Sequence, residues 1–331
     1  FKKFSEGHIR IMETLGHLHL TQRDLAKAES LFRVCLEEGI KKLGEDHPAI
    51  AASRQNMGVL CLQQGKIREA EPLLASCWEA WKIQKGQDHP ETLACMSNLS
   101  QIYKATGDLQ KAESFMRECL ELKLKNLNLG DNHPSTQTSR INLASFYKSQ
   151  GQFDKAIPLL LTSLEKESTQ LGEEHPNVIE IRQALAETQM RLADKFFKGE
   201  EFDKAEPLFV ACLEHSSRCG AHLLTISARM NLSVIYVRRA QHLDRTESSM
   251  KSNISSLTAS HGEKHPATIL QKEELKKFEK KWKPVINENL DKAELHLVAS
   301  VDLSKDQHGG NHPVTQTLTE RLRFFREAWR Q

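Results

Sequence analysis

The chain has 331 residues, of which 39% are hydrophobic and 27% charged, so it is too apolar to be disordered throughout. Forty-six Lys and Arg residues against forty-four Asp and Glu residues give a net charge of +2, which argues against a nucleic-acid partner. Its longest apolar runs are much shorter than the roughly 20 residues that span a bilayer, so no membrane insertion is expected.

The N-terminus and the cysteines indicate the context of the chain. It begins Phe1-Lys2-Lys3 without a methionine, which predicts a fragment with flanking domains of the same chain. Seven cysteines, with no Cys-x-x-Cys pair among them, argue against a disulfide framework. Because free cysteines are typical of a reducing compartment, we expect a cytoplasmic protein.

A short motif, Gly-x-hydrophobic-x-x-Ala, recurs along the chain. It occupies residues 65–70, 107–112 and 151–156, and weaker copies extend the series in both directions. The last residue of each copy serves as a marker, and these markers are Ala28, Ala70, Ala112, Ala156, Ala205, Thr246 and Ala293. Self-similarity at a period near 42 predicts about seven structural repeats.

Residues of defined size stand at fixed distances from each marker. The position four after the marker always holds a large apolar residue: Phe32, Leu74, Met116, Leu160, Phe209, Met250 and Leu297. A second position holds small residues, namely Gly16, Gly58, Ser100, Ala144 and Ser233. Apolar residues spaced by three and four on both sides of the glycine predict two amphipathic helices per repeat, with the glycine as a left-handed cap between them.

Loops with the pattern Gly-x-x-His-Pro, or close copies of it, separate most of the repeats. Their histidines are His47, His89, His133, His175, His265 and His312. A single histidine per loop cannot build a tetrahedral metal site, so we expect no metal and no cofactor. We interpret the imidazole as a hydrogen-bond partner of the loop backbone and the proline as the first residue of the next helix.

The later repeats depart from this pattern. Pro176 precedes its marker by 29 residues instead of 22, which predicts a longer first helix or a longer hairpin loop in the fifth repeat. In the seventh repeat Pro284 would break or kink a helix, and lysines at 276, 277, 280 and 281 make the surface basic. We therefore expect a solenoid over residues 1–313, regular over 1–176 and divergent over 177–313, and a capping helix over 314–331.

The recurring small residue, Tyr, Gly and Ala resemble the tetratricopeptide repeat. The 42-residue period with a Leu-Gly-x-x-His-Pro loop is similar to the repeats of kinesin light chain and nephrocystin-3, over about residues 9–313. The resemblance implies an all-α fold: a right-handed superhelical solenoid of helix hairpins. It also implies a protein-protein interaction scaffold or adaptor whose concave groove binds an extended peptide or a partner helix.

The candidate groove residues come from the first helix of each repeat. Asparagines recur just before the small residue, at Asn56, Asn98, Asn142 and Asn231. In the tetratricopeptide family the matching position holds the backbone or the terminal carboxylate of a bound peptide, and an amide suits this because it both donates and accepts. We expect Gln101, Lys104 and Lys148 to face the same way, with Arg10 near the entrance, so that the ligand has an acidic or carboxylate anchor. The alternative is that these asparagines bond within the stack.

Catalysis is not expected from this sequence. No phosphate-binding glycine loop, nucleophile elbow or His-Glu-x-x-His helix is present. Cysteines at a fixed distance from the marker, Cys35, Cys77, Cys119 and Cys212, are interpreted as small buried packing residues. A second hypothesis for the whole chain is a self-association, docking or autoinhibitory module of a larger signalling or enzyme-bearing protein.

Overall fold

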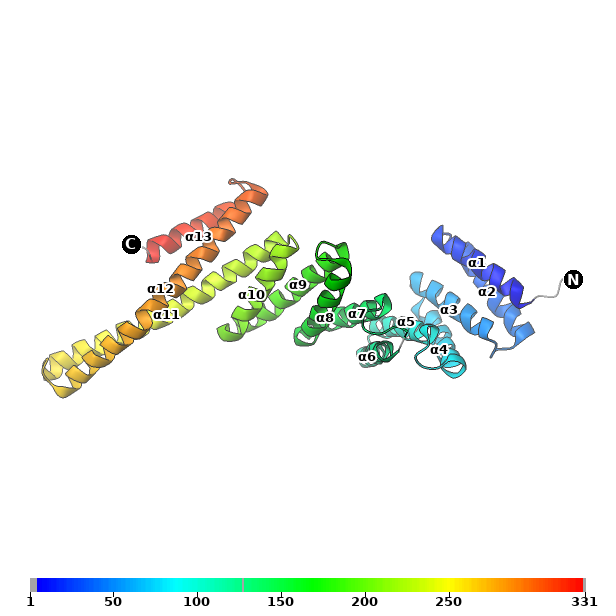
Figure 1. The fold of residues 1–331 in the computed structure, drawn as a ribbon, viewed down its shortest axis with the longest axis horizontal. Helices are drawn as coiled ribbons and strands as arrows, with labels where there is room; N and C mark the ends of the chain where they lie inside the picture. The colour runs from blue at the N-terminus through cyan, green and yellow to red at the C-terminus, as the bar shows by residue number, and fades with distance from the viewer. Residues whose placement is uncertain (1–4, 127, 330–331) are drawn as a thin grey trace. The chain divides into compact units, whose positions relative to one another are not determined.

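The computed structural model describes residues 5–126 and 128–329, and the elements in these ranges are helices joined by short turns (Figure 1). Their contacts divide the chain into two compact units, residues 1–151 and 152–331. The first unit contains α1 (Glu6–Thr21), α2 (Leu25–Leu43), α3 (Pro48–Gln63), α4 (Ile67–Lys85), α5 (Pro90–Thr106), α6 (Leu109–Lys125) and α7 (Pro134–Ser149). The second contains α8 (Phe153–Leu171), α9 (Pro176–Lys198), α10 (Phe202–Arg218), α11 (His222–His261), α12 (Pro266–His308) and α13 (Pro313–Trp329). The all-α prediction is confirmed.

Glycines with positive φ end the first helix of the regular hairpins, as the repeat motif predicts. Gly65, Gly107 and Gly151 have φ between 70° and 85°, and a Cβ atom built on any of them would meet nothing within 4 Å. The requirement is therefore conformational and not steric, because only glycine adopts this backbone without strain. Arg23 and Glu200 hold the same place in the first and fifth hairpins and also adopt positive φ, at 60° and 59°.

Paired small and large residues set the spacing of the helices within a hairpin. A Cβ atom on Gly16 would lie 2.5 Å from the ring of Phe32, and one on Gly58 would lie 2.7 Å from Leu74. Phe32 and Leu74 are fully buried. The predicted size pattern therefore describes close packing between the two helices of each pair.

The histidines of the His-Pro loops are helix N-caps, which confirms their structural interpretation. In α3, α5, α7, α9, α12 and α13 the histidine Nδ1 atom accepts a hydrogen bond from the backbone N–H two residues later, at 3.0–3.3 Å. The proline between them is the first helical residue, where no N–H is needed. Each loop therefore satisfies one of the free donors at a helix start.

Replacing His133 with alanine should lower the free energy of unfolding by about 1 kcal/mol, because the N–H of Ser135 loses its acceptor. Chemical denaturation of the wild type and the variant would measure this difference. His133→Asn is the matched control, since an asparagine side chain also caps helices and should recover most of the loss. Equal losses in both variants would show that the imidazole acts in some other way.

The fifth repeat has the longer first helix that its spacing allows. Helix α9 has 23 residues, whereas α3, α5 and α7 have 16 or 17. The predicted hairpin count is wrong beyond this point, because α11 and α12 are continuous helices of 40 and 43 residues that pack along each other (Figure 1). Within the described ranges, six helix pairs therefore precede the terminal helix, and not seven.

One feature of the sequence accompanies the long helices. No glycine stands between Gly220 and Gly262, or between Gly262 and Gly309, so both helices lack the residue that most readily adopts a left-handed cap. Of the two effects predicted for Pro284, a break or a kink, the break does not occur, since α12 runs through this residue. The terminal helix is confirmed as α13, which buries Leu318 and Phe325. Residues 330 and 331 of the predicted cap lie outside the described residues.

Candidate functional site

Two of the four predicted groove asparagines are held by carboxylates on neighbouring first helices. Asn231 donates from Nδ2 to Asp194 Oδ1 at 3.1 Å, and Asn56 hydrogen-bonds Glu13, which also accepts from Ser53. Burial raises the pKa of both carboxyls, and the hydrogen bonds partly offset this. At Asn56 and Asn231 the alternative, a structural role within the stack, therefore describes the geometry better.

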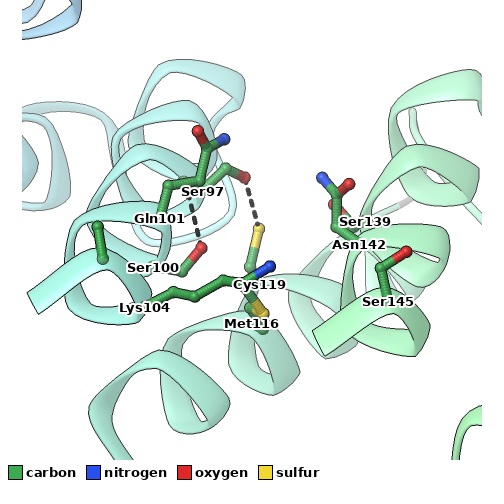
Figure 2. A pocket seen from close by; sticks show the side chains of 10 residues that line it. Ser97, Ser100, Gln101, Lys104, Met116, Cys119, Ser139, Asn142 and Ser145 are labelled. Atoms are coloured by element: carbon green, nitrogen blue, oxygen red, sulfur yellow. Dashed lines mark hydrogen bonds between the residues drawn. The ribbon is translucent and has the colours of Figure 1, made fainter. Parts of the chain in front are cut away.

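A cavity of about 530 Å³ lies between α5, α6 and α7 of the first unit (Figure 2). Gln101 and Lys104 line it from α5, and Asn142 lines it from α7. These are three of the eight predicted residues. Figure 2 shows Lys104 extending from α5 toward Met116 and Cys119 of α6. The structure therefore brings a primary amide from each of two helices to one opening, together with a cationic side chain.

Four serines also line the cavity. They are Ser97, Ser100, Ser139 and Ser145. Ser100 donates to the carbonyl of Ser97 at 2.7 Å, and the Ser97 hydroxyl lies 3.4 Å from Cys119 Sγ (Figure 2). Met116 and Ala105 supply apolar surface. A cavity with this lining can hydrogen-bond a peptide main chain and enclose a small side chain.

A buried lysine stands directly behind this wall. Lys123 is only 6% exposed, and its Nζ donates to Ser139 Oγ at 2.7 Å and to the carbonyl of Ser135 at 3.2 Å. Burial lowers the pKa of Lys123. Because the ammonium uses an acceptor site of Ser139, the serine keeps its own proton to donate into the cavity. No carboxylate is among the described residues that line the cavity, so its electrostatic character is positive.

The other predicted residues lie elsewhere. Asn98 is half-buried on α5, but its neighbour Ser97 lines the cavity in its place. Lys148 is half-buried near the end of α7 and does not contribute to the wall, and Arg10 is exposed on α1. Lys123 and Ser139 were not predicted from the sequence. Their only signal was a lysine at a position where other repeats hold Gly39, Trp81 or Glu167.

The cysteines are packing residues, as predicted from their spacing. Cys35, Cys77, Cys119 and Cys212 are buried. Burial raises the pKa of Cys35 to about 11 and that of Cys212 to about 12, so these thiols stay protonated at neutral pH and are poor nucleophiles.

Neither a metal-binding cluster nor a membrane span occurs in the part of the chain that the structure describes. Within residues 5–126 and 128–329, no group of three or more His, Cys, Asp or Glu side chains could hold a metal ion. No helix in the same ranges has the length and apolar character needed to cross a membrane.

Comparisons with known proteins agree with the repeat pattern. Models of the tetratricopeptide repeat match residues 7–82, 69–125 and 139–173. The crystal structure of kinesin light chain nearly identical TPR-like repeats from Podosopora anserina aligns with a TM-score of 0.53 and 22% identity, over 65% of this chain and 98% of that one. A single-substitution variant of those repeats aligns with a TM-score of 0.53 and 21% identity, over 66% of this chain and 99% of that one. No curated protein sequence matches the chain. At these identities the structural matches show the fold alone.

Proposed function

Because this chain carries tetratricopeptide repeats, we propose that it is a non-catalytic interaction protein that binds an extended peptide at the cavity between α5, α6 and α7. The observation that carries the proposal is the lining of that cavity, where amide, hydroxyl and ammonium groups converge without a carboxylate among the described residues. Its seven cysteines are free thiols, which suits action in the cytoplasm.

The chemistry of the wall favours a peptide with a carboxylate anchor. The side chain of Lys104 makes no hydrogen bond or ion pair with any described residue, so its charge is available to a ligand. Gln101 and Asn142 can each donate to a peptide carbonyl and accept from a peptide N–H. The anchor, either an acidic side chain or a terminal carboxylate, would lie near Lys104 and accept from the Ser139 hydroxyl.

Lys104→Glu should weaken binding of acidic peptides by about tenfold or more, because it replaces an attractive charge with a repulsive one. The measurement is fluorescence anisotropy with a set of labelled peptides that end in a free carboxylate, together with their C-terminal amides. Asn142→Ala should weaken the binding of the same peptides by about fivefold, because one pair of hydrogen bonds to the peptide main chain is lost.

Lys42→Glu is the matched control. Lys42 is exposed in the last turn of α2, so its reversal changes the net charge equally without touching the cavity. We expect less than a twofold effect from it, which is about what screening allows for a distant surface charge. Equal losses of affinity in Lys42→Glu and Lys104→Glu, or no loss in either variant, would show that the peptide does not bind in this cavity. Circular dichroism would verify that the helices persist in each variant.

A further inference from the structure

A cavity of the second unit lies where the long helix pair meets α10, and the function proposed above does not use it. It measures about 990 Å³. The turn between α9 and α10, the middle of α11 and the middle of α12 all contribute to its wall. It therefore forms at the place where the expected sixth and seventh hairpins are replaced by continuous helices.

Aromatic and aliphatic side chains form one part of its lining. Phe202 comes from α10, Leu243 from α11, and Trp282 and Val285 from α12. Neighbouring rings fix both aromatic side chains, since Phe197 lies 5.7 Å from Phe202 and Phe278 lies 6.4 Å from Trp282, measured between ring centroids. This part of the cavity can bury one bulky apolar side chain of a ligand.

An unused hydrogen-bonding group lies in the same wall. Asn289 is only 8% exposed, yet its side chain has no hydrogen-bond partner among the residues that the structure describes. Because Asn289 lines the cavity, its amide can both donate to a ligand and accept from one.

The basic residues of the lining show which charge the cavity can accept. Arg238 binds Glu200 at 2.8 Å, and Arg239 binds both Asp203 at 2.7 Å and Glu206. The side chain of Asp203 is 96% exposed, so this ion pair is weak and an incoming carboxylate can replace it.

Two further cations, one in the wall and one beside the lining residue Trp282, have no carboxylate partner among the described residues. Arg245 lines the wall and forms no ion pair within the described part of the chain. Lys281 lies with its Nζ 4.8 Å from the centroid of the Trp282 ring and is likewise unpaired there. The three carboxylates just named are already bound by Arg238 and Arg239, so the charge left for a ligand is positive.

From this combination we infer a second binding site, which takes an acidic peptide segment that carries one bulky apolar residue. The apolar residue enters between Phe202 and Trp282, and an adjacent carboxylate pairs with Arg245. Asn289 hydrogen-bonds the main chain beside the anchor. The site does not depend on the cavity between α5, α6 and α7, and its residues belong to the part of the chain that departs most from the repeat pattern.

The test uses a fluorescein-labelled synthetic peptide of aspartate, glutamate and serine with one central leucine and an amidated C-terminus. Arg245→Glu should weaken its binding by about tenfold or more. Asn289→Ala should weaken it by about fivefold. A peptide with serine in place of the leucine should bind about tenfold more weakly to the wild type, because the apolar contact is lost.

Controls separate this site from general attraction and from the first cavity. Lys264→Glu makes the same charge reversal at the exposed turn between α11 and α12, and it should change binding less than about twofold. All of these variants are also measured in the Lys104→Glu background, which removes binding of the acidic peptide at the first cavity, and the loss caused by Arg245→Glu should persist there. Equal losses from Lys264→Glu and Arg245→Glu, no effect of the leucine, or no binding at all would overturn the inference. If Asn289→Ala fails to fold, the exposed Arg245 still decides the outcome.

Discussion

Phe209→Ala is expected to lower the stability of residues 152–331 by about 3–5 kcal/mol, the usual cost of removing a buried phenylalanine. Phe209 is 0% exposed and lies in the core formed by α9–α13, with the ring of Phe197 6.0 Å away between centroids. It stands four residues after its marker, where every repeat holds a large apolar side chain.

Phe209→Ala should destabilise the second unit more than the first. Repeats contact mainly their neighbours, so stability is approximately a sum of local terms. Hydrogen–deuterium exchange measures this by segment. Amides of α9, α10 and the first half of α11 should exchange faster in the variant, while those of α3 and α4 should change little. Phe324→Ala is the control, since Phe324 is 59% exposed and should cost less than about 0.5 kcal/mol. Uniform acceleration along the whole chain would instead indicate that the two units unfold together.

The sequence predicts the hairpins well where a single residue determines the backbone. Gly65, Gly107 and Gly151 end helices because their φ is positive, and the loop histidines begin helices because Nδ1 accepts a backbone hydrogen bond. These are local effects, so a repeated residue indicates a repeated conformation. The pairing of Gly58 with Leu74 is likewise visible in the sequence as a size pattern.

The long helices were not predicted because the marker positions recur inside them, although no turn precedes the marker there. Gln241 and Glu288 stand where the regular repeats have glycine. A missing glycine is not sufficient by itself, since Arg23 and Glu200 adopt the left-handed conformation in the same position. In the first repeat Asp24 follows and caps α2 by accepting from the N–H of Lys27, whereas His242 holds that place in α11. A cap is not decisive either, since the side chain of Glu201 makes no cap hydrogen bond where α10 begins, and Asn289, a residue type that favours caps, lies inside α12.

The candidate site was only partly predictable from the sequence. Periodicity identifies positions that recur in every repeat, whereas the lining of a cavity depends on side chains that differ between repeats. Asn142, Gln101 and Lys104 were found from their recurring slot and its neighbours. Asn56 lies on α3, outside the cavity, and it hydrogen-bonds Glu13, which stands at a position with no repeat signal. Lys123 was overlooked because its position holds residues of unrelated chemistry in the other repeats, and only the folded chain brings it to Ser139.

Lys123→Met should increase the stability of the first unit by about 1 kcal/mol while weakening the binding of acidic peptides several-fold. The ammonium is buried beside two neutral acceptors, Ser135 and Ser139, and it has no carboxylate partner in the described ranges. Methionine fills a similar volume without that desolvation cost. The variant also removes the charge behind the Ser139 hydroxyl, so an anionic ligand loses a favourable interaction.

The pH dependence of unfolding gives an independent measure of the same lysine. Its folded-state pKa lies below the ordinary value of 10.5, so the cost of burying the charge is fully present at neutral pH. As pH rises through the folded pKa toward 10.5, the folded state loses its proton first and the wild type gains stability. Lys123→Met should lack this gain. Lys125→Met, at an exposed position two residues away, should behave as the wild type. A loss of stability in Lys123→Met would show that its two hydrogen bonds outweigh desolvation, and the lysine would then be structural.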